Sequence, residues 1–256
     1  MKKYIIMCSL LLVGLYSVLK AQDILVIEMN DNTTRKFKVE DIFQMTFQTS
    51  QTSGTDPSCP VAEAIDLGLP SGTLWASWNI GASAPEEYGG YFAWGEKEEK
   101  GYYDWSTYKW CYGSYITLTK YCYDSYYGNN GFTDGLTELL PEDDAATANW
   151  GSPWHMPTKD QIKELIDNCT QTWTQQNGVN GTLVSGPNGR SIFLPAAGNW
   201  WRDGLEGEGS YGDYWSSSLS PYNSNGANYL GLSNRGLEFR DGQFRDLGFS
   251  VRAVCP

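Results

Sequence analysis

Histidine is almost absent from this sequence, in which His155 is the single histidine among 256 residues. The cysteines form no Cys-x-x-Cys pair. Zinc sites and thioredoxin-like redox sites are built from such residues, so the sequence gives almost no support to either. His155 has no evident nucleophile beside it, and Ser216-Ser217-Ser218 lacks the Gly-x-Ser-x-Gly setting of a hydrolase nucleophile. We therefore expect a protein that is not an enzyme.

Basic residues are also scarce, with 18 Lys and Arg against 30 Asp and Glu. Lys2, Lys3 and Lys20 stand in the first 21 residues, and removal of that segment leaves 15 basic residues against 30 acidic ones, a net charge of −15. Such a surface repels phosphate backbones and anionic lipid headgroups. We expect no nucleic-acid partner and no direct membrane binding.

Long hydrophobic runs are missing after residue 21. The one early run, Ile5 to Leu19, is too short for a confident membrane span and is followed at once by Lys20. Lys2 and Lys3 precede it, and Ala21 offers a small residue for cleavage. This pattern predicts a signal peptide over residues 1–21 and an exported protein that is secreted, periplasmic or at the cell surface. An uncleaved membrane anchor is the alternative.

Aromatic residues and glycine are abundant instead, with 11 Trp, 17 Tyr and 28 Gly beside only 19% charged residues. Large aromatic side chains bury much area, and glycine lets loops turn sharply between them. Two interpretations follow, and both can hold at once. One is a loop-rich aromatic core, and the other is a surface with aromatic platforms for a ligand.

Five cysteines remain after residue 21, an odd number, so at least one thiol is unpaired or shared with a partner. Export permits disulfides. Our hypothesis pairs Cys111 with Cys122, and Cys59 with Cys255 across the two ends of the main domain.

The chain divides by pattern into a leading module, a linker and one large domain. Residues 22–48 read as a small β-strand module, with a strand at Ile24 to Ile27, a turn at Asn30-Asp31-Asn32 and a returning strand from Thr33 to Val39. Residues 49–62, rich in Ser, Thr, Gly and Pro, read as a linker. The large domain covers residues 63–256.

Two helices are predicted in this domain. Thr158 and Gln161 have capping-box spacing, and apolar residues recur from Ile162 to Cys169 at helical spacing, which predicts a helix from Thr158 to about Cys169. A shorter helix is expected to begin near Pro141, where proline suits the first turn and Glu142, Asp143 and Asp144 suit the positive end.

Strands dominate the last third. Thr182 to Ser185 and Ser191 to Leu194 flank the turn signal Gly186-Pro187-Asn188-Gly189. Asp241-Gly242 predicts a two-residue hairpin loop in which Phe239 opposes Phe244. Two helices against short antiparallel strands with long loops indicate an α+β fold.

Five stretches carry motifs of a known family. They are Ile65 to Glu96 (IDLGLPSGTLWASWNIGASAPEEYGGYFAWGE), Leu140 to Cys169 (LPEDDAATANWGSPWHMPTKDQIKELIDNC), Ile192 to Gly198 (IFLPAAG), Tyr214 to Ser218 (YWSSS) and Gly248 to Val254 (GFSVRAV). In these motifs and their order, residues 63–256 resemble the bacterial major paralogous domain first noted in Fibrobacter succinogenes. The leading module is similar to short modules that precede such domains in exported proteins of gut Bacteroidetes.

The resemblance implies a C-type lectin-like fold, in the branch that includes formylglycine-generating enzymes and the variable proteins of diversity-generating retroelements. The first and last strands of that fold pair, which is compatible with a Cys59–Cys255 disulfide. Formylglycine-generating enzymes use a cysteine pair near the C-terminus, where this chain has Cys255 alone, so that chemistry is not expected. The chain departs from the family pattern at His155, where arginine is common, and at Ile162, where a charged or aromatic residue is common.

No cofactor is expected. Glu142, Asp143 and Asp144 offer oxygen ligands for Ca²⁺, but acids at the start of a helix need no ion to explain them. The sugar-binding triplets familiar in C-type lectins, Glu-Pro-Asn and Trp-Asn-Asp, do not occur in the sequence.

The predicted ligand-binding face lies in the C-terminal third, in the place that retroelement-diversified proteins of this fold use as their variable surface. Its mix of Tyr, Asn, Asp and Arg is typical of antibody paratopes, and a pair of adjacent tryptophans adds a stacking platform. An ordinary polar loop is the alternative. The predicted contact residues are Trp200, Trp201, Tyr222, Asn223, Asn225, Asn228, Tyr229, Asn234, Arg235, Arg240, Asp241 and Arg245.

Three functions compete at this point. The first is an exported, non-enzymatic recognition module that binds a glycan or a protein at the cell surface, as an adhesin does. The second is a structural, tip or accessory subunit of a surface assembly, docked through residues 22–48 by strand pairing. The third is an uncharacterised hydrolase.

Overall fold

The structure is a computed structural model that describes residues 24–28, 34–38 and 62–256. The chain divides into two compact units, Met1–Gly54 and Thr55–Pro256. The predicted signal peptide, the predicted linker and Cys59 lie outside the described residues. Among the described residues, no helix is long and apolar enough to cross a membrane.

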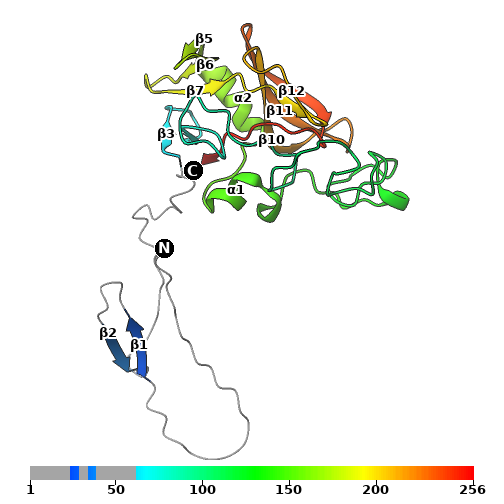
Figure 1. The fold of residues 1–256 in the computed structure, drawn as a ribbon, viewed down its shortest axis with the longest axis horizontal. Helices are drawn as coiled ribbons and strands as arrows, with labels where there is room; N and C mark the ends of the chain where they lie inside the picture. Colours follow the sequence, from blue (N-terminus) through cyan, green and yellow to red (C-terminus); the bar gives the residue numbers. More distant parts are fainter. Residues whose placement is uncertain (1–23, 29–33, 39–61) are drawn as a thin grey trace, which may run out of the picture. The chain divides into compact units, whose positions relative to one another are not determined.

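The first unit contains one antiparallel strand pair, drawn in blue in Figure 1. Strand β1 (Ile24–Glu28) pairs with β2 (Thr34–Lys38), and Ile24 lies opposite Lys38. The two strands predicted for this module are therefore confirmed.

The second unit is α+β, as predicted, and its two ends meet in one small sheet. Strand β4 (Leu74–Ala76) lies between β3 (Ala64–Asp66) and the last strand, β13 (Val254–Cys255). Val254 lies opposite Trp75 in the antiparallel register. The final strand thus pairs with the second strand of this unit.

A second sheet follows the long helix. Strands β5 (Thr170–Gln176), β6 (Val179–Ser185) and β7 (Ser191–Pro195) form an antiparallel meander. Ser185 lies opposite Ser191, so the chain turns between them where the glycine-proline signal predicted it. A short strand pair comes next, β8 (Asn199–Trp201) with β9 (Gly204–Glu206).

The third sheet consists of β10 (Tyr211–Leu219), β11 (Gly226–Ser233) and β12 (Gly236–Phe244), with β11 in the middle. This sheet overturns the predicted hairpin. Asp241-Gly242 does not turn the chain but lies inside β12, and Phe239 and Phe244 pair with Leu230 and Gly226 of β11.

The Asp-Gly signal has another physical role. The register shifts by one residue between Ala227 and Tyr229, so β12 carries an extra residue at this point. Gly242 has a φ of +79°, which glycine adopts without steric cost and which a bulge requires. The actual turn is at Asn234-Arg235, between Ser233 and Gly236.

The predicted helices are confirmed with small differences. Helix α2 (Lys159–Asn168) begins after Thr158, whose hydroxyl and the Gln161 side chain form the expected capping box. Near Pro141 the chain makes a single 3-10 turn, η3 (Pro141–Asp143), and then α1 (Ala145–Trp150). Asp144 caps α1, because its carboxylate accepts a hydrogen bond from the Thr147 N–H at 2.9 Å.

The third sheet separates two parts of the core. On one face, Tyr214, Leu230 and Leu232 pack with Ile162 and Leu165 of α2. On the other, the indole of Trp215 stacks on Phe249, with ring centres 4.0 Å apart. Since strand side chains alternate between faces, adjacent residues Tyr214 and Trp215 serve different layers.

Candidate functional site

The predicted ligand-binding face is divided between surface and interior. Six of its twelve residues are exposed: Trp201, Tyr222, Asn234, Arg235, Arg240 and Asp241. Trp200 and Asn223 are half-buried. Four others, namely Asn225, Asn228, Tyr229 and Arg245, are buried. These four cannot contact a ligand without unfolding, so that part of the prediction is wrong.

Position in the sheet explains the buried residues of β11. Asn228 and Tyr229 belong to the middle strand, which has a neighbour on each side. Tyr229 packs edge-on against Trp215, with ring centres 6.2 Å apart, and Asn228 donates to the Leu219 carbonyl at 3.3 Å. The residue types that are common in paratopes therefore occur at core positions of this protein as well as at surface positions.

One predicted residue, Arg240, lies near a buried acid, Asp213. Asn199 donates to the Asp213 carboxylate at 2.8 Å. Gly231 lies opposite Asp213, and a Cβ at Gly231 would lie 3.0 Å from Arg240 Nε, so glycine leaves room for that arginine. Burial raises the pKa of Asp213 to about 6, while Asn199 and Arg240 act in the opposite direction. Trp201 is on the same face of β8 as Asn199, because the two are separated by one residue.

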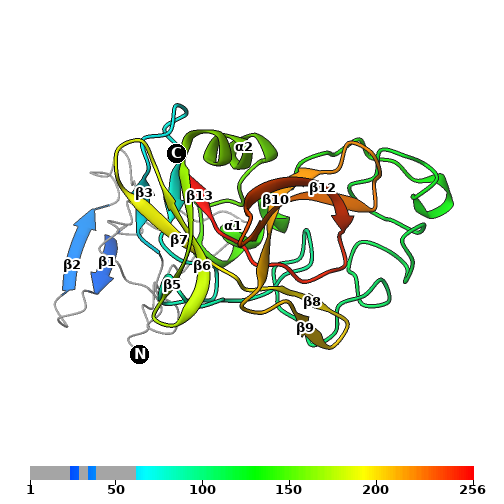
Figure 2. The same ribbon diagram turned by 90° about the horizontal axis from the view of Figure 1, so that it is seen from above.

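Exposed aromatic side chains gather elsewhere, on the irregular segment between β4 and α1. The green part of this segment, after about residue 100, lies on the side of β10–β12 away from β5–β7 in Figures 1 and 2. The exposed fraction is 72% for Tyr112, 67% for Tyr126 and 43% for Tyr115, and it is 49% for Phe244 of β12. Single exposed aromatics are ordinary, but a contiguous group marks an interaction surface.

Three of these exposed rings and two half-buried ones form a continuous chain, which we call the aromatic strip: Phe244, Trp105, Tyr115, Tyr127 and Tyr126. Successive ring centres are 6.0, 6.3, 6.5 and 5.0 Å apart. Neighbouring rings are tilted by 54° to 88°, so the strip is not flat. The strip begins on β12 and continues over the irregular segment between β4 and α1, which we call the long loop.

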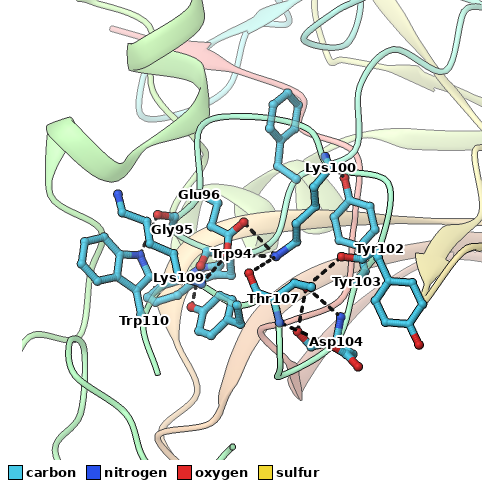
Figure 3. Close-up of polar contacts among 12 residues, drawn as sticks. Trp94, Gly95, Glu96, Lys100, Tyr102, Tyr103, Asp104, Thr107, Lys109 and Trp110 are labelled. Atoms are coloured by element: carbon cyan, nitrogen blue, oxygen red, sulfur yellow. Dashed lines mark hydrogen bonds and ion pairs between the residues drawn. The ribbon is translucent and has the colours of Figure 1, made fainter. Parts of the chain in front are cut away.

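A buried ion pair holds the start of this loop, as Figure 3 shows. The Lys100 ammonium donates to the Glu96 carboxylate at 3.0 Å and to the Thr107 carbonyl at 3.2 Å. The same carboxylate accepts the Lys109 N–H at 2.7 Å. Glu96 thereby binds Lys100 and Lys109, and Lys100 binds Thr107, so this segment is positioned without a strand or helix.

Aromatic groups add further attachments beneath the strip. The Tyr108 hydroxyl donates to the Trp94 carbonyl at 2.7 Å. The Trp110 indole N–H donates to the Gly95 carbonyl at 2.8 Å (Figure 3). Asp104 accepts the backbone N–H of Ser106 at 2.8 Å, a local turn that precedes Thr107.

Arg245 is part of this support and is not a ligand contact. Its side chain is fully buried and donates to the Tyr121 carbonyl at 2.8 Å. The guanidinium lies 5.3 Å from the Trp94 ring centre and 5.4 Å from that of Tyr108. Such cation–π contacts stabilise a desolvated arginine, which here fastens the long loop to the end of β12.

The predicted Cys111–Cys122 disulfide is not formed. Both are free thiols, and they are directed at different carbonyls. Cys111 Sγ lies 3.2 Å from the Trp105 carbonyl oxygen, and Cys122 Sγ lies 3.1 Å from that of Asp124. Cys255 is buried, and the predicted Cys59–Cys255 pairing stays a prediction because Cys59 lies outside the described residues.

The acids considered for Ca²⁺ have internal partners. Asp143 accepts from Lys120 at 2.6 Å and from the Tyr121 hydroxyl at 2.7 Å, and Asp144 accepts the Met156 N–H at 2.8 Å. Glu142 is exposed, with its carboxylate 3.9 Å from Lys120. In the described part of the chain, no group of three or more His, Cys, Asp or Glu side chains is placed to hold a metal ion.

Sequence reasoning missed the aromatic strip, although a signal was present. Nine of the 17 tyrosines stand between residues 102 and 127. They have no period of two or 3.6, so no strand or helix organises them, and periodicity gave no reason to single them out.

Comparison of the chain with protein-family models, with curated proteins and with solved structures finds no match. The assignment of a class therefore depends on the residues themselves.

Proposed function

We propose that the second unit is the recognition domain of an exported protein and binds a neutral glycan along the aromatic strip without chemical turnover. The proposal includes the C-type lectin-like fold implied by the motifs between Ile65 and Val254. The observation that carries it is the chain of five neighbouring rings, three of which are exposed: Phe244, Tyr115 and Tyr126.

The chemistry of the strip favours a glycan. Sugar rings have C–H faces that stack on aromatic faces, and their hydroxyls find partners in the tyrosine hydroxyls and in exposed Asp124 and Ser125 nearby. The tilt between rings prevents contact with a flat, crystalline surface and suits a single twisted chain. The charge of the protein favours a neutral ligand, because a chain with a net charge of −12 repels polyanions.

Changing two strip tyrosines together, Tyr115→Ala with Tyr126→Ala, is expected to weaken binding to a neutral soluble polysaccharide by about ten-fold or more. Each ring contributes on the order of 1 kcal/mol beyond the area it buries, and about 1.4 kcal/mol corresponds to a factor of ten. A panel of neutral polysaccharides in affinity electrophoresis identifies the ligand, and titration calorimetry measures the loss.

Tyr112→Ala is the matched control. Tyr112 is on the same loop and is the more exposed side chain, but its ring is not part of the strip. We expect this variant to bind like the parent chain. An equal loss of binding in the control contradicts the proposal, and so does a lack of retention on every neutral polysaccharide. If a protein ligand binds through the same tyrosines, the strip is a protein-binding surface and the glycan proposal is wrong.

A further inference from the structure

A second concave site lies apart from the strip and is not used by the proposed function. It has a volume of about 320 Å³ and is lined by Tyr123, Glu138, Lys159 and Ser220, together with Thr137 and the apolar residues Leu219 and Pro221. This volume is at the lower end of the range for small-molecule sites, so a compact ligand suits it.

The walls of this pocket are fixed by the backbone. The Leu219 N–H donates to the Thr137 carbonyl at 2.8 Å, and the Lys159 N–H donates to the Ser218 hydroxyl at 2.9 Å. The Tyr123 N–H donates to the Ser224 hydroxyl at 3.1 Å. Three segments distant in the sequence are thereby joined, and the pocket is formed before any ligand arrives.

Two opposite charges line the pocket without pairing. Within the described residues, no carboxylate lies at ion-pair distance from Lys159, and no basic side chain lies at ion-pair distance from Glu138. Glu138 accepts one hydrogen bond, from the Ser217 hydroxyl at 3.0 Å. An ammonium group and a carboxylate therefore both remain available to a bound molecule.

Tyr123, one of the residues that line the pocket, has a hydroxyl that lacks a partner among the described residues. The Tyr123 hydroxyl oxygen is buried and makes no hydrogen bond within the described part of the protein. Burial raises the pKa of Tyr123, so the phenol stays protonated and can donate at neutral pH. A ligand in the pocket does not reach this hydroxyl, because the oxygen has almost no accessible surface, so Tyr123 contributes to the wall through its other atoms.

We infer that this pocket binds a zwitterionic small molecule of the α-amino acid class. Lys159 holds the carboxylate, Glu138 holds the ammonium group, and the side chain lies against Leu219 and Pro221. A zwitterion suits this protein better than an anion, because a molecule without net charge is not repelled by a chain whose net charge is −12. The inference does not depend on glycan binding.

Calorimetric titration of the full chain with glycine, L-serine, L-leucine, L-glutamate and L-lysine tests it. At least one of the five is expected to bind and to raise the melting temperature of the protein. For L-leucine as ligand, 4-methylpentanoate lacks the ammonium group and 3-methylbutylamine lacks the carboxylate. Each analogue is expected to bind at least ten-fold more weakly, since each loses one charged contact.

Variants locate the site. Lys159→Met and Glu138→Gln are expected to weaken amino-acid binding at least ten-fold, whereas Lys163→Met and Glu98→Gln, which change exposed charges elsewhere, leave it unchanged. Absence of binding by all five amino acids overturns the inference, and so does equal loss in the control variants. Binding that survives Tyr115→Ala with Tyr126→Ala separates this pocket from the aromatic strip.

Discussion

Arg252→Met is expected to lower the free energy of unfolding of the second unit by about 3 to 5 kcal/mol, the largest single effect of those considered. Arg252 is almost fully buried, and its guanidinium donates to four acceptors on two parts of the chain. They are Asn79 Oδ1 at 2.8 Å, the Ala76 and Ser77 carbonyls at 3.1 and 3.3 Å, and the Phe193 carbonyl at 2.9 Å.

The cost arises from the acceptors that methionine leaves behind. Burial lowers the pKa of Arg252 to about 10, so the side chain stays charged at neutral pH and makes strong hydrogen bonds. Methionine fills much of the same volume but donates to none of the four oxygens. Each buried acceptor left without a partner costs about 1 to 3 kcal/mol, offset in part by the desolvation that a neutral side chain avoids.

Urea denaturation followed by tryptophan fluorescence measures this loss in the full chain. All 11 tryptophans stand between residues 75 and 215, so the signal reports the second unit alone. Arg190→Met is the control, because Arg190 is exposed and its contact with Glu63, at 3.5 Å, is also on the surface. We expect the control to stay within about 0.5 kcal/mol of the parent chain. A loss below about 1 kcal/mol for Arg252→Met would show that water replaces the guanidinium.

The second prediction concerns two buried acids. Asp213→Asn and Asp246→Asn are each expected to raise the free energy of unfolding at pH 7, by about 1 to 3 kcal/mol. Burial raises the pKa of both carboxyls to about 6. For Asp246, nearby Asp104 acts in the same direction, while Lys100 and Arg245 oppose it. One oxygen of Asp246 has no hydrogen-bond partner within the described residues, which disfavours the charged form further.

The sign of the pH dependence follows from proton binding. Between about pH 4 and pH 6 the folded protein binds more protons at these two sites than the unfolded chain does, because the unfolded carboxyls ionise near 3.9. Stability contributed by the two sites is therefore present below about pH 4 and is lost as the pH rises through 6. The advantage of each asparagine variant is expected to be largest at pH 7 and to vanish near pH 4.

Denaturation curves at pH 4, 5, 6 and 7 check this expectation. Asp203→Asn is the matched control, since Asp203 is exposed, and its effect should be small and independent of pH. A difference between parent and Asp213→Asn that is the same at pH 4 and pH 7 would contradict a raised pKa at that site.

Local signals predicted local structure well. The capping box of Thr158 and Gln161 and the apolar spacing from Ile162 onward set the start and inner face of α2, because both depend on residues within two helical turns. The turn after Ser185 follows from Gly186-Pro187-Asn188-Gly189 for the same reason. The Asp241-Gly242 signal also marked a real irregularity, but the same dihedral freedom serves a hairpin and a bulge, and only the partner strand distinguishes them.

Long-range contacts decided what local patterns could not. Asn228 and Tyr229 look like surface residues by type, yet packed side chains cover both faces of β11, so they are buried. Arg245 would be exposed in the predicted hairpin, but the fold places it against Trp94 and Tyr108. Only part of the predicted ligand-binding face is therefore exposed, including Trp201, Tyr222 and Arg240.

By itself, the sequence determined the α+β class, the long helix with its cap, the turn between β6 and β7, and an acidic, aromatic-rich composition. These properties depend on composition and on neighbours a few residues apart. Only the tertiary structure decided which aromatic rings meet, as when Phe244 of β12 lies beside Trp105 of the long loop. The reason is that a surface is made by segments distant in the chain, and their contact depends on how the whole core packs.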